Sequence, residues 1–325
     1  MRWGILGTSF ISGVMADAIN HDEASTLQAV AGRNQETLQQ FVSDYAPLTS
    51  YTSMEELIQD PDVDVVYIAL PNHLHHDFVI KAAEQGKAIL CEKSLSVDME
   101  KSHAAIEAVR QHNVFFAEGL MYLNHPLIQS LLDTLEQGTI GEIRSVQASY
   151  VAAISQFVNP DSKGALYNLG CYPVSLMHLL LQHQYGDQVF NDYQIEAIGR
   201  RGDDGNICET SAMIRFNPKL TAQLHTAEDY GLSHSFKILG SKGSIQLETN
   251  PWLPSSENSL SVEVYETSKQ VIDVPAKGDG FYYQVRQIHQ AIESGQKQLS
   301  RPSATAQDSL AIMRLLTQWE QAAGQ

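Results

Sequence analysis

The segment 62–94 constrains the fold of this chain more than any other part of the sequence. Its first apolar run, 63–70, is rich in β-branched residues and nearly continuous, which is typical of a parallel strand buried on both faces. A helix is predicted next, over about 73–85, with Gly86 at its C-terminal cap. A second apolar strand follows at 88–91. This strand–helix–strand order predicts an α/β fold built on a parallel sheet.

Glu92 and Lys93 follow the second of these strands directly. They are therefore expected at the carboxyl edge of the sheet, where open α/β sheets bind their ligands. A lysine at such an edge, beside a carboxyl group, can clamp a substrate or donate a proton. The alternative is a solvent-exposed ion pair at a strand end, and the spacing by itself leaves both readings open.

The N-terminus predicts a phosphate-binding loop between a strand at 3–7 and a helix at 10–19. The loop sequence is an imperfect match to the dinucleotide fingerprint Gly-x-Gly-x-x-Gly/Ala, because Ser9 stands in place of the second glycine. The Cβ of Ser9 is expected to push a pyrophosphate outward unless its hydroxyl donates to it. Free N–H groups and the helix dipole still favour a phosphate at this junction. The residues expected to contact the cofactor here are Gly7, Thr8, Ser9, Phe10 and Ile11.

The end of the next predicted strand, which begins at Thr26, indicates the choice of cofactor. An Asp or Glu there would accept hydrogen bonds from a ribose 2′-hydroxyl, and none is present. Gly32 leaves room, and Arg33 offers a planar guanidinium to a 2′-phosphate. The sequence therefore favours NADP(H), with NAD(H) as the second choice. The alternative is that Arg33 is an ordinary surface charge.

Taken in order, the motifs Asn72-x-x-His75, Gly86-Lys87 and Glu92-Lys93 resemble a known family. The chain, over nearly its whole length, is similar to the glucose-fructose oxidoreductase, inositol dehydrogenase and rhizopine-catabolism (Gfo/Idh/MocA) superfamily of nicotinamide-dependent oxidoreductases. The family usually reads Glu-Lys-Pro, whereas Ser94 stands here, so the fixed φ of proline is lost. The resemblance implies a cofactor site that also includes Leu70, Pro71, Asn72, His75, Glu92 and Lys93.

The strand–helix alternation ends near residue 119, and a different pattern follows. We predict an N-terminal Rossmann domain over 1–119 that binds NADP(H), and a C-terminal α+β domain over 120–325 for substrate binding and oligomerisation. The second domain is expected to contain a large, mostly antiparallel, open-faced sheet. Its predicted helices lie at about 126–137, 175–182, 281–294 and 304–323, and its strands at 143–153, 194–199, 208–216, 220–228, 235–239 and 244–248, with a hairpin at 240–243.

The segment 163–174 resembles the family stretch Gly-Gly-Gly-x-Leu-x-Asp-x-Gly-x-His/Tyr, whose last residue works opposite the lysine. The resemblance implies that Tyr172 and Lys93 form the catalytic pair, as in the dihydrodiol dehydrogenase-like branch. Asn168 replaces the family's Asp, and an amide can orient a substrate but cannot accept a proton. The resemblance places Asn168, Tyr122 and Lys163 at the substrate. The alternative for Tyr172 is a core tyrosine at a helix entrance.

Other histidines carry weaker signals. His73, His75 and His76 are too close to the start of one helix to converge on a metal ion, and no acidic or Cys partner has ligand spacing, so no metal is expected. His225 lies within an alternating strand and is either a substrate ligand or structural.

Composition sets the broad class of the protein. A chain of 325 residues with 43% hydrophobic content exceeds one ordinary core and predicts two domains. A formal charge of −17 disfavours nucleic acids and anionic membranes as partners, and no apolar run is long enough to span a bilayer. The three cysteines are widely spaced, which suits reduced thiols. Met1 leads straight into a strand, so no signal peptide and a cytoplasmic location are expected.

These features together predict an NADP(H)-preferring dehydrogenase or reductase. It would move hydride between the nicotinamide and a secondary alcohol or carbonyl of a sugar, cyclitol or dihydrodiol-like substrate. The second possibility among enzymes is NAD-dependent cyclitol oxidation. A catalytically inactive nucleotide-binding sensor or regulator is the alternative class, and the presence of both Lys93 and Tyr172 favours the enzyme. A homodimer or a dimer of dimers is expected, because the resemblance implies that the open sheet face forms a subunit contact.

Overall fold

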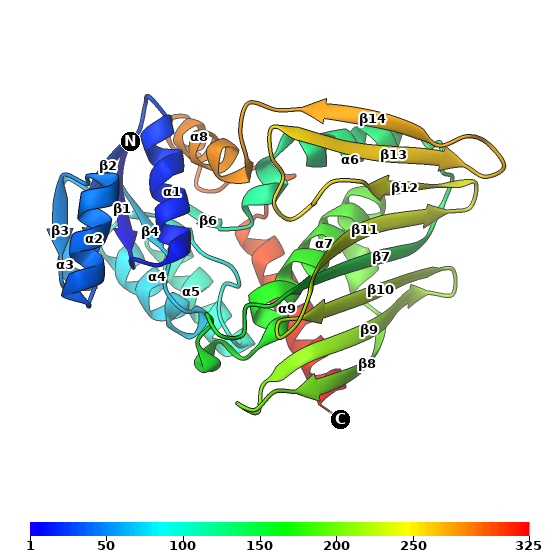
Figure 1. The fold of residues 1–325 in the computed structure, drawn as a ribbon, viewed down its shortest axis with the longest axis horizontal. Helices are drawn as coiled ribbons and strands as arrows, with labels where there is room; N and C mark the ends of the chain where they lie inside the picture. Colours follow the sequence, from blue (N-terminus) through cyan, green and yellow to red (C-terminus); the bar gives the residue numbers. More distant parts are fainter. Residues whose placement is uncertain (325) are drawn as a thin grey trace. The chain divides into compact units, whose positions relative to one another are not determined.

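The computed structural model describes residues 1–324, which form two compact units (Figure 1). The first unit comprises residues 1–121 and 281–310, and the second comprises residues 122–280 and the C-terminal residues from Ala311. The predicted boundary between residues 119 and 120 lies close to this division. The return of residues 281–310 to the first unit was not anticipated from the sequence. Within residues 1–324, no helix has both the length and the apolar character needed to cross a membrane.

The first unit is built on a parallel sheet of six strands over residues 2–118. The strand order β3-β2-β1-β4-β5-β6 is that of the dinucleotide-binding Rossmann fold, so the predicted fold class is confirmed. Its central strands are buried on both faces, which explains their continuous apolar runs. The strands are β1 (Arg2–Leu6), β2 (Thr26–Ala31), β3 (Thr49–Tyr51), β4 (Val65–Ile68), β5 (Ala88–Cys91) and β6 (Phe116–Glu118).

Helices alternate with these strands, and several of them begin at a side chain that accepts a hydrogen bond from the first turn. The helix that follows β5 begins at Met99, because Asp98 Oδ1 accepts a hydrogen bond from the Lys101 amide at 2.8 Å. The helix predicted from residue 73 begins as the short turn η1 (Asn72–Leu74). The helices are α1 (Phe10–His21), α2 (Gln35–Tyr45), α3 (Met54–Gln59), α4 (His75–Glu84), α5 (Met99–Gln111), α8 (Gly280–Glu293) and the first residues of α9 (Ala306–Ala323).

The second unit is built on a sheet of eight strands over residues 143–275, in the order β14-β13-β12-β11-β7-β10-β9-β8. The sheet is mostly antiparallel, as predicted, and the β11–β12 hairpin lies at residues 240–243. β10 pairs antiparallel with β9 and parallel with β7. The strands are β7 (Ile143–Ala152), β8 (Gln194–Arg201), β9 (Ile207–Asn217), β10 (Leu220–Ala227), β11 (Leu232–Gly240), β12 (Gly243–Leu247), β13 (Glu257–Val264) and β14 (Gln270–Pro275).

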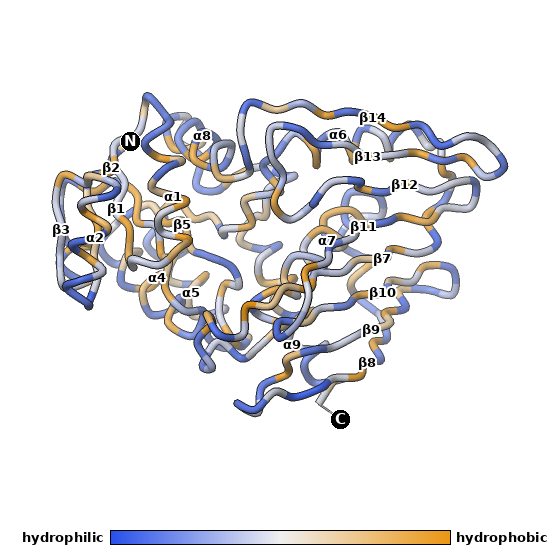
Figure 2. Tube along the Cα trace, in the orientation of Figure 1, coloured by the Kyte–Doolittle hydropathy of each residue, from blue (hydrophilic) through white to orange (hydrophobic). Residues whose placement is uncertain are grey.

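Helices cover one face of this second sheet (Figure 1). The helix α6 (Pro126–Glu136) packs on β13 and β14, and α7 (Cys171–Tyr185) packs on β7 and β10. Trp319, in the later part of α9, donates its indole N–H to Thr210 on β9 at 2.9 Å. Buried and exposed positions alternate along β9 and β10, and Figure 2 shows hydrophobic and hydrophilic residues mixed along these strands. On the other face of the sheet, the described residues of this unit place no helix.

The start of α7 differs from the sequence-based prediction. The helix was expected from Ser175, whereas it begins at Cys171 and follows directly on the π-turn η4 (Leu166–Gly170). Pro173 lies in the first helical turn, where N–H groups have no partner within the helix and proline is tolerated. Tyr172 is therefore a residue of the helix itself.

Candidate functional site

The loop between β1 and α1 is held against the end of β4 by a glycine. Gly7 has a φ of +104°, and a Cβ at this position would lie 2.7 Å from the carbonyl oxygen of Ala69. No other residue fits there, so the loop that follows Gly7 has a fixed path. Ser9 caps α1 in a reciprocal arrangement with Ser12, whose hydroxyl accepts a hydrogen bond from the Ser9 amide at 3.2 Å. The N-terminus of α1 therefore lies at the carboxyl edge of the sheet, as dinucleotide loops require.

Arg33 lies beside this loop. A Cβ on Gly32 would lie 2.8 Å from the Cγ2 of Thr8, so glycine at position 32 lets the end of β2 approach the phosphate loop. Arg33 is exposed and is followed by Asn34, which caps α2 by accepting from the amides of Glu36 and Thr37. An exposed guanidinium next to a helix N-terminus suits a second phosphate group.

His75 connects the ends of β4 and β5. The side chain is fully buried; its Nε2 lies 2.7 Å from the carbonyl oxygen of Leu70 and its Nδ1 lies 2.8 Å from that of Ser94. Burial, with the nearby charge of Lys93, lowers the pKa of His75 to about 4, so the ring is neutral at physiological pH. Both ring nitrogens face backbone carbonyls, which makes His75 a support of the loop that carries Lys93. A direct contact of His75 with the nicotinamide stays a prediction.

Glu92 is a buried carboxyl group. Tyr67 donates its hydroxyl to Glu92 Oε1 at 2.6 Å, and the Lys93 amide donates to Glu92 Oε2 at 3.2 Å. Burial raises the pKa of Glu92, while the charge of Lys93 and the bond from Tyr67 oppose that rise. The side chain of Lys93 is half-buried, and the peptide bond between Lys93 and Ser94 is cis. Glu92 therefore fixes the lysine's backbone from inside the sheet and is no part of a solvent-exposed ion pair.

Glu118, which the sequence analysis missed, is a second buried carboxyl at the same edge. It ends β6, and its Oε1 accepts from the Leu95 amide at 3.0 Å. Burial raises the pKa of Glu118 to about 7. The amides on both sides of the Lys93–Ser94 peptide are thus held by carboxyl groups. The rule that pointed to Glu92, a polar residue directly after a buried strand, applies equally to Glu118 and could have identified it.

In the second unit, Tyr172 lies in a cluster of aromatic rings. Its ring centroid is 5.2 Å from that of Tyr150, 5.7 Å from that of Tyr122 and 6.1 Å from that of Trp252. Tyr122 is fully buried and donates its hydroxyl toward the first turn of α7, at 3.2 Å from the Tyr172 carbonyl and 2.7 Å from Ser175 Oγ. Tyr122 therefore supports the helix that carries Tyr172, and its contact with a substrate stays a prediction.

Asn168 precedes Tyr172 by four residues, about one helical turn, and is bound to a carboxyl group. Its Nδ2 donates to Glu228 Oε2 at 2.7 Å, and both side chains are buried. Glu228 follows β10 directly. No sequence signal connected Asn168 with Glu228, because the two are far apart in the chain. Lys163 lies with its Nζ 5.9 Å from the centroid of the Tyr167 ring.

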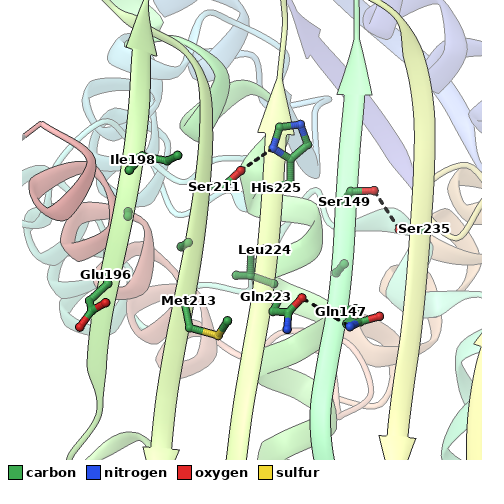
Figure 3. Close-up of a pocket in the computed structure, with 13 residues that line it drawn as sticks. Gln147, Ser149, Glu196, Ile198, Ser211, Met213, Gln223, Leu224, His225 and Ser235 are labelled. Atoms are coloured by element: carbon green, nitrogen blue, oxygen red, sulfur yellow. Dashed lines mark hydrogen bonds between the residues drawn. The ribbon is translucent and has the colours of Figure 1, made fainter.

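The described residues 1–324 contain no cluster of three or more His, Cys, Asp or Glu side chains that could hold a metal ion. His225 Nδ1 lies 2.9 Å from Ser211 Oγ on the open face of the second sheet (Figure 3). Cys91, Cys171 and Cys208 are buried, and none of them forms a disulfide within residues 1–324.

Lys93 and Tyr172 belong to different compact units. Each is supported within its own unit, Lys93 by Glu92 and Tyr172 by Tyr122. That the two side chains work on one substrate remains a prediction from the sequence.

Two family models match the chain. The model described as an oxidoreductase family with an NAD-binding Rossmann fold covers residues 1–120, and the GFO/IDH/MocA C-terminal domain covers residues 128–246. The trans-1,2-dihydrobenzene-1,2-diol dehydrogenase of Xenopus laevis is 30% identical over 314 residues, which cover 91% of this chain and 91% of the relative. An uncharacterized oxidoreductase of Rhizobium meliloti, ORF334, is 29% identical over 311 residues, covering 91% of this chain and 90% of the relative.

Solved structures share the fold. The 3-ketoreductase KijD10 from Actinomadura kijaniata, in complex with NADP and TDP-benzene, has a TM-score of 0.87 at 25% identity, covering 98% of this chain and 96% of that one. Levoglucosan dehydrogenase, in complex with NADH and levoglucosan, has a TM-score of 0.82 at 21% identity, covering 100% and 97%. The resemblance drawn from the sequence motifs is thereby confirmed.

Proposed function

This chain belongs to the oxidoreductase family with an NAD-binding Rossmann fold, and we propose that it is an NADP(H)-preferring dehydrogenase or reductase acting on CH–OH groups. The observation that carries the proposal is the carboxyl edge of the first sheet. There the glycine-fixed loop after β1 faces the end of β4, and Lys93 is held by Glu92 at the end of β5. Open α/β sheets bind dinucleotides at this edge.

The nicotinamide, when bound, would supply or accept the hydride. A proton must accompany that hydride when the reacting carbon carries oxygen. Lys93 and Tyr172 are the groups that would hold the substrate oxygen and exchange this proton. The ammonium of Lys93 would also stabilise a developing alkoxide. The buried carboxyls Glu92 and Glu118 fix the backbone from which Lys93 projects, and this reduces the reorganisation needed during reaction.

The proposed substrate is a secondary alcohol or carbonyl compound of the sugar, cyclitol or dihydrodiol type. The polar pair of Asn168 and Glu228 suits hydroxyl groups, and the aromatic rings around Tyr172 suit the apolar face of a ring. The relatives support this class, since one acts on a dihydrobenzenediol and another is a 3-ketoreductase.

The preference for NADP(H) rests on Arg33 and on the lack of an acidic residue within 26–34. Gly32 brings the end of β2 against Thr8, so the Arg33 backbone lies next to the loop expected to bind the pyrophosphate. The NADP found with the 3-ketoreductase agrees with this preference.

A homodimer, or a dimer of dimers, is the proposed assembly, and the cytoplasm is the proposed location. The open face of the second sheet carries a hollow of ≈ 690 Å³, lined by side chains of β7 to β11 (Figure 3). Most of its polar side chains are small or uncharged, and Ser149 and Ser235 bond each other across it. Ile198 is 77% exposed on this face, and Met213 is 44% exposed. A mostly antiparallel sheet with one bare face is a surface that a second copy can cover.

The test is a comparison of cofactor binding and turnover. Calorimetric titration with NADPH and NADH gives the preference, and nicotinamide absorbance then follows a panel of polyols, dihydrodiols and their carbonyl forms. We expect the unmodified protein to turn over a member of this panel and the Lys93→Met variant, which serves as the blank, not to do so. Tight cofactor binding without turnover of any member would overturn the enzyme proposal in favour of a nucleotide sensor.

A further inference from the structure

Glu228 is a buried carboxyl that the proposed mechanism does not yet use. It is 3% exposed, and its one described side-chain hydrogen bond comes from the amide of Asn168, at 2.7 Å. Asn168 is itself 6% exposed. Burying a carboxyl group costs free energy. A buried carboxyl that is bonded to a side chain near a candidate catalytic residue is therefore a candidate for a functional role.

The backbone on both sides of this pair is fixed. The Glu228 amide donates to the Cys208 carbonyl at 2.9 Å, and the Glu228 carbonyl accepts from the amides of Ile154 and Ser155 at 2.8 and 2.9 Å. These contacts anchor Glu228 to β9 and to the segment after β7. A side chain on so constrained a backbone has few directions open to it, and here it points to Asn168.

Asn168 is positioned by the π-turn η4. The backbone amide of Asn168 donates to the Gly164 carbonyl at 3.1 Å. A Cβ on Gly170 would lie 3.4 Å from Thr226 Cγ2, so the turn lies directly on β10. Tyr172 follows one turn later, on the same side of the helix as Asn168. Asn168, and with it the carboxyl of Glu228, therefore belongs to the same local surface as Tyr172.

The charges around Glu228 are mostly negative. Asp204 and Asp229 both add to the effect of burial, which raises the pKa of Glu228 to about 7, while the bond from Asn168 opposes it. Arg200, on strand β8, is bound by Asp229 at 2.8 Å and by Glu209 at 2.9 Å. Of the other titratable groups on adjoining elements, the Cys208 thiol has a raised pKa, and the Tyr167 hydroxyl donates to Glu320 at 2.6 Å.

We propose that Glu228 is a positioning residue of the substrate site, which orients the Asn168 amide beside Tyr172 so that the two side chains bind a substrate hydroxyl as one unit. This inference rests on the proposed function. An amide that donates to a carboxylate becomes polarised, and its carbonyl oxygen becomes a better acceptor. When Glu228 takes up a proton it can donate instead, and the orientation of the amide is no longer set. Asn168 cannot be ionised, so any dependence of the pair on pH belongs to Glu228.

The experiment exchanges the carboxyl between the two positions. Glu228→Gln leaves two amides, Asn168→Asp leaves two carboxyls, and the double variant restores one of each with the same hydrogen bond. Loss of a charge-assisted hydrogen bond corresponds to roughly 10–100-fold, so each single variant should lose about that factor in kcat/KM, mainly through KM. The double variant should recover most of it. In the unmodified protein, kcat/KM should fall as the pH drops below neutral, because Glu228 then takes up a proton. Glu228→Gln should not show this fall.

Controls separate this proposal from a purely structural role and from failure of the proposed function. Glu257→Gln, at an exposed position of β13, should leave kcat/KM unchanged, and all variants should keep the NADPH affinity of the unmodified protein. If Glu228→Gln kept the kcat/KM and the pH profile of the unmodified protein, the inference would be overturned and the proposed function would stand. The same holds if the double variant were as impaired as the worse of the two single variants. Absence of turnover in the unmodified protein would overturn the proposed function and this inference with it.

Discussion

The Nδ1 of His75 lies 2.8 Å from the carbonyl oxygen of Ser94, the residue directly after Lys93. Its Nε2 lies 2.7 Å from the Leu70 carbonyl, so one buried ring spans the ends of two neighbouring strands. A neutral imidazole carries one N–H and can donate to only one of these carbonyls. The ring would satisfy both carbonyls only when protonated, and burial opposes protonation. Protonation of His75 is therefore coupled to folding.

His75→Gln tests this coupling through stability. The folded-state pKa of His75, about 4, lies below its ordinary value of 6.5, so the group stabilises the fold above pH 6.5 and loses this contribution as the pH falls toward 4. The loss amounts to roughly 3 kcal/mol, at about 1.4 kcal/mol per pKa unit. Urea unfolding should show that the stability difference between the unmodified protein and His75→Gln shrinks between pH 7 and pH 4. A difference that stays constant over this range would contradict the assignment.

Glu118→Gln should show the opposite trend. The pKa of Glu118 is raised from 4.5 to about 7, so the folded state holds a proton that the unfolded state has lost over this range. Stability from this group is present below pH 4.5 and is lost as the pH rises to 7, by roughly 3 kcal/mol. Gln keeps an oxygen for the Leu95 amide, so the variant should gain stability relative to the unmodified protein as the pH rises. Equal pH profiles in urea unfolding would rule out a buried titrating Glu118.

Arg33→Ala tests the cofactor preference. Removing a charge-assisted bond to the 2′-phosphate should weaken NADPH binding by about 1.5–3 kcal/mol and leave NADH binding nearly unchanged. Calorimetric titration of both cofactors measures this. Arg2→Ala, which removes a guanidinium at the opposite end of β1, is the matched control and should bind both cofactors as before. Tighter binding of NADH than of NADPH by the unmodified protein would defeat the assignment.

Lys93→Met and Tyr172→Phe test the chemistry. General acid–base groups contribute ~10²–10⁴ in rate, and the lysine change also removes the charge that holds the substrate oxygen, so it should cost more in kcat. The controls are Lys101→Met, in the first turns of α5, and Tyr265→Phe, directly after β13 in the second unit. Both site variants should still bind NADPH. A folded Lys93→Met variant with near-normal kcat would refute the mechanism.

Met213→Glu tests the proposed assembly. A charge placed on the open sheet face should disfavour a copy that covers it, since burying an unpaired carboxylate costs several kcal/mol. Light scattering should show a species twice the 36.0 kDa chain mass for the unmodified protein and a smaller one for the variant. Leu48→Glu, at an exposed position of the first unit, should not change the mass. A protein that is monomeric at micromolar concentration would contradict the proposal.

The parallel sheet could be predicted because its signals are local. The buried run at 63–70, the cap at Gly86 and the polar residues after each strand are short-range patterns, and together they located the phosphate loop and Lys93. The same reasoning missed β13 and β14, which form one edge of the second sheet and alternate with many polar residues. The parallel pairing of β10 with β7 could not be predicted either, because an alternating pattern fits parallel and antiparallel pairing equally well.

The candidate site was predicted only where each residue could be assigned on its own. Lys93 and Tyr172 came from motifs, whereas the partner of Asn168 came from a distant strand end. Nothing in the sequence relates Glu228 to Asn168, because only the packing of the π-turn η4 on β10 brings them together. The first turn of α7 was misplaced for a local reason, since a proline commonly marks a helix boundary, whereas Pro173 lies within the first turn.

Residues from far along the chain bind the outer edge of β6, the last strand of the Rossmann sheet. The Phe116 amide donates to the Lys297 carbonyl at 3.0 Å, and Gln284 donates to the Glu118 carbonyl at 3.2 Å. During synthesis on the ribosome, at ~5–20 residues per second, residue 298 follows residue 121 by roughly 9–35 s. Throughout that interval the nascent nucleotide-binding unit exposes an open β6 edge, which is a template for pairing with other chains. A stop codon or a protease cut after residue 121 is therefore expected to give an aggregation-prone fragment and not an independently stable domain.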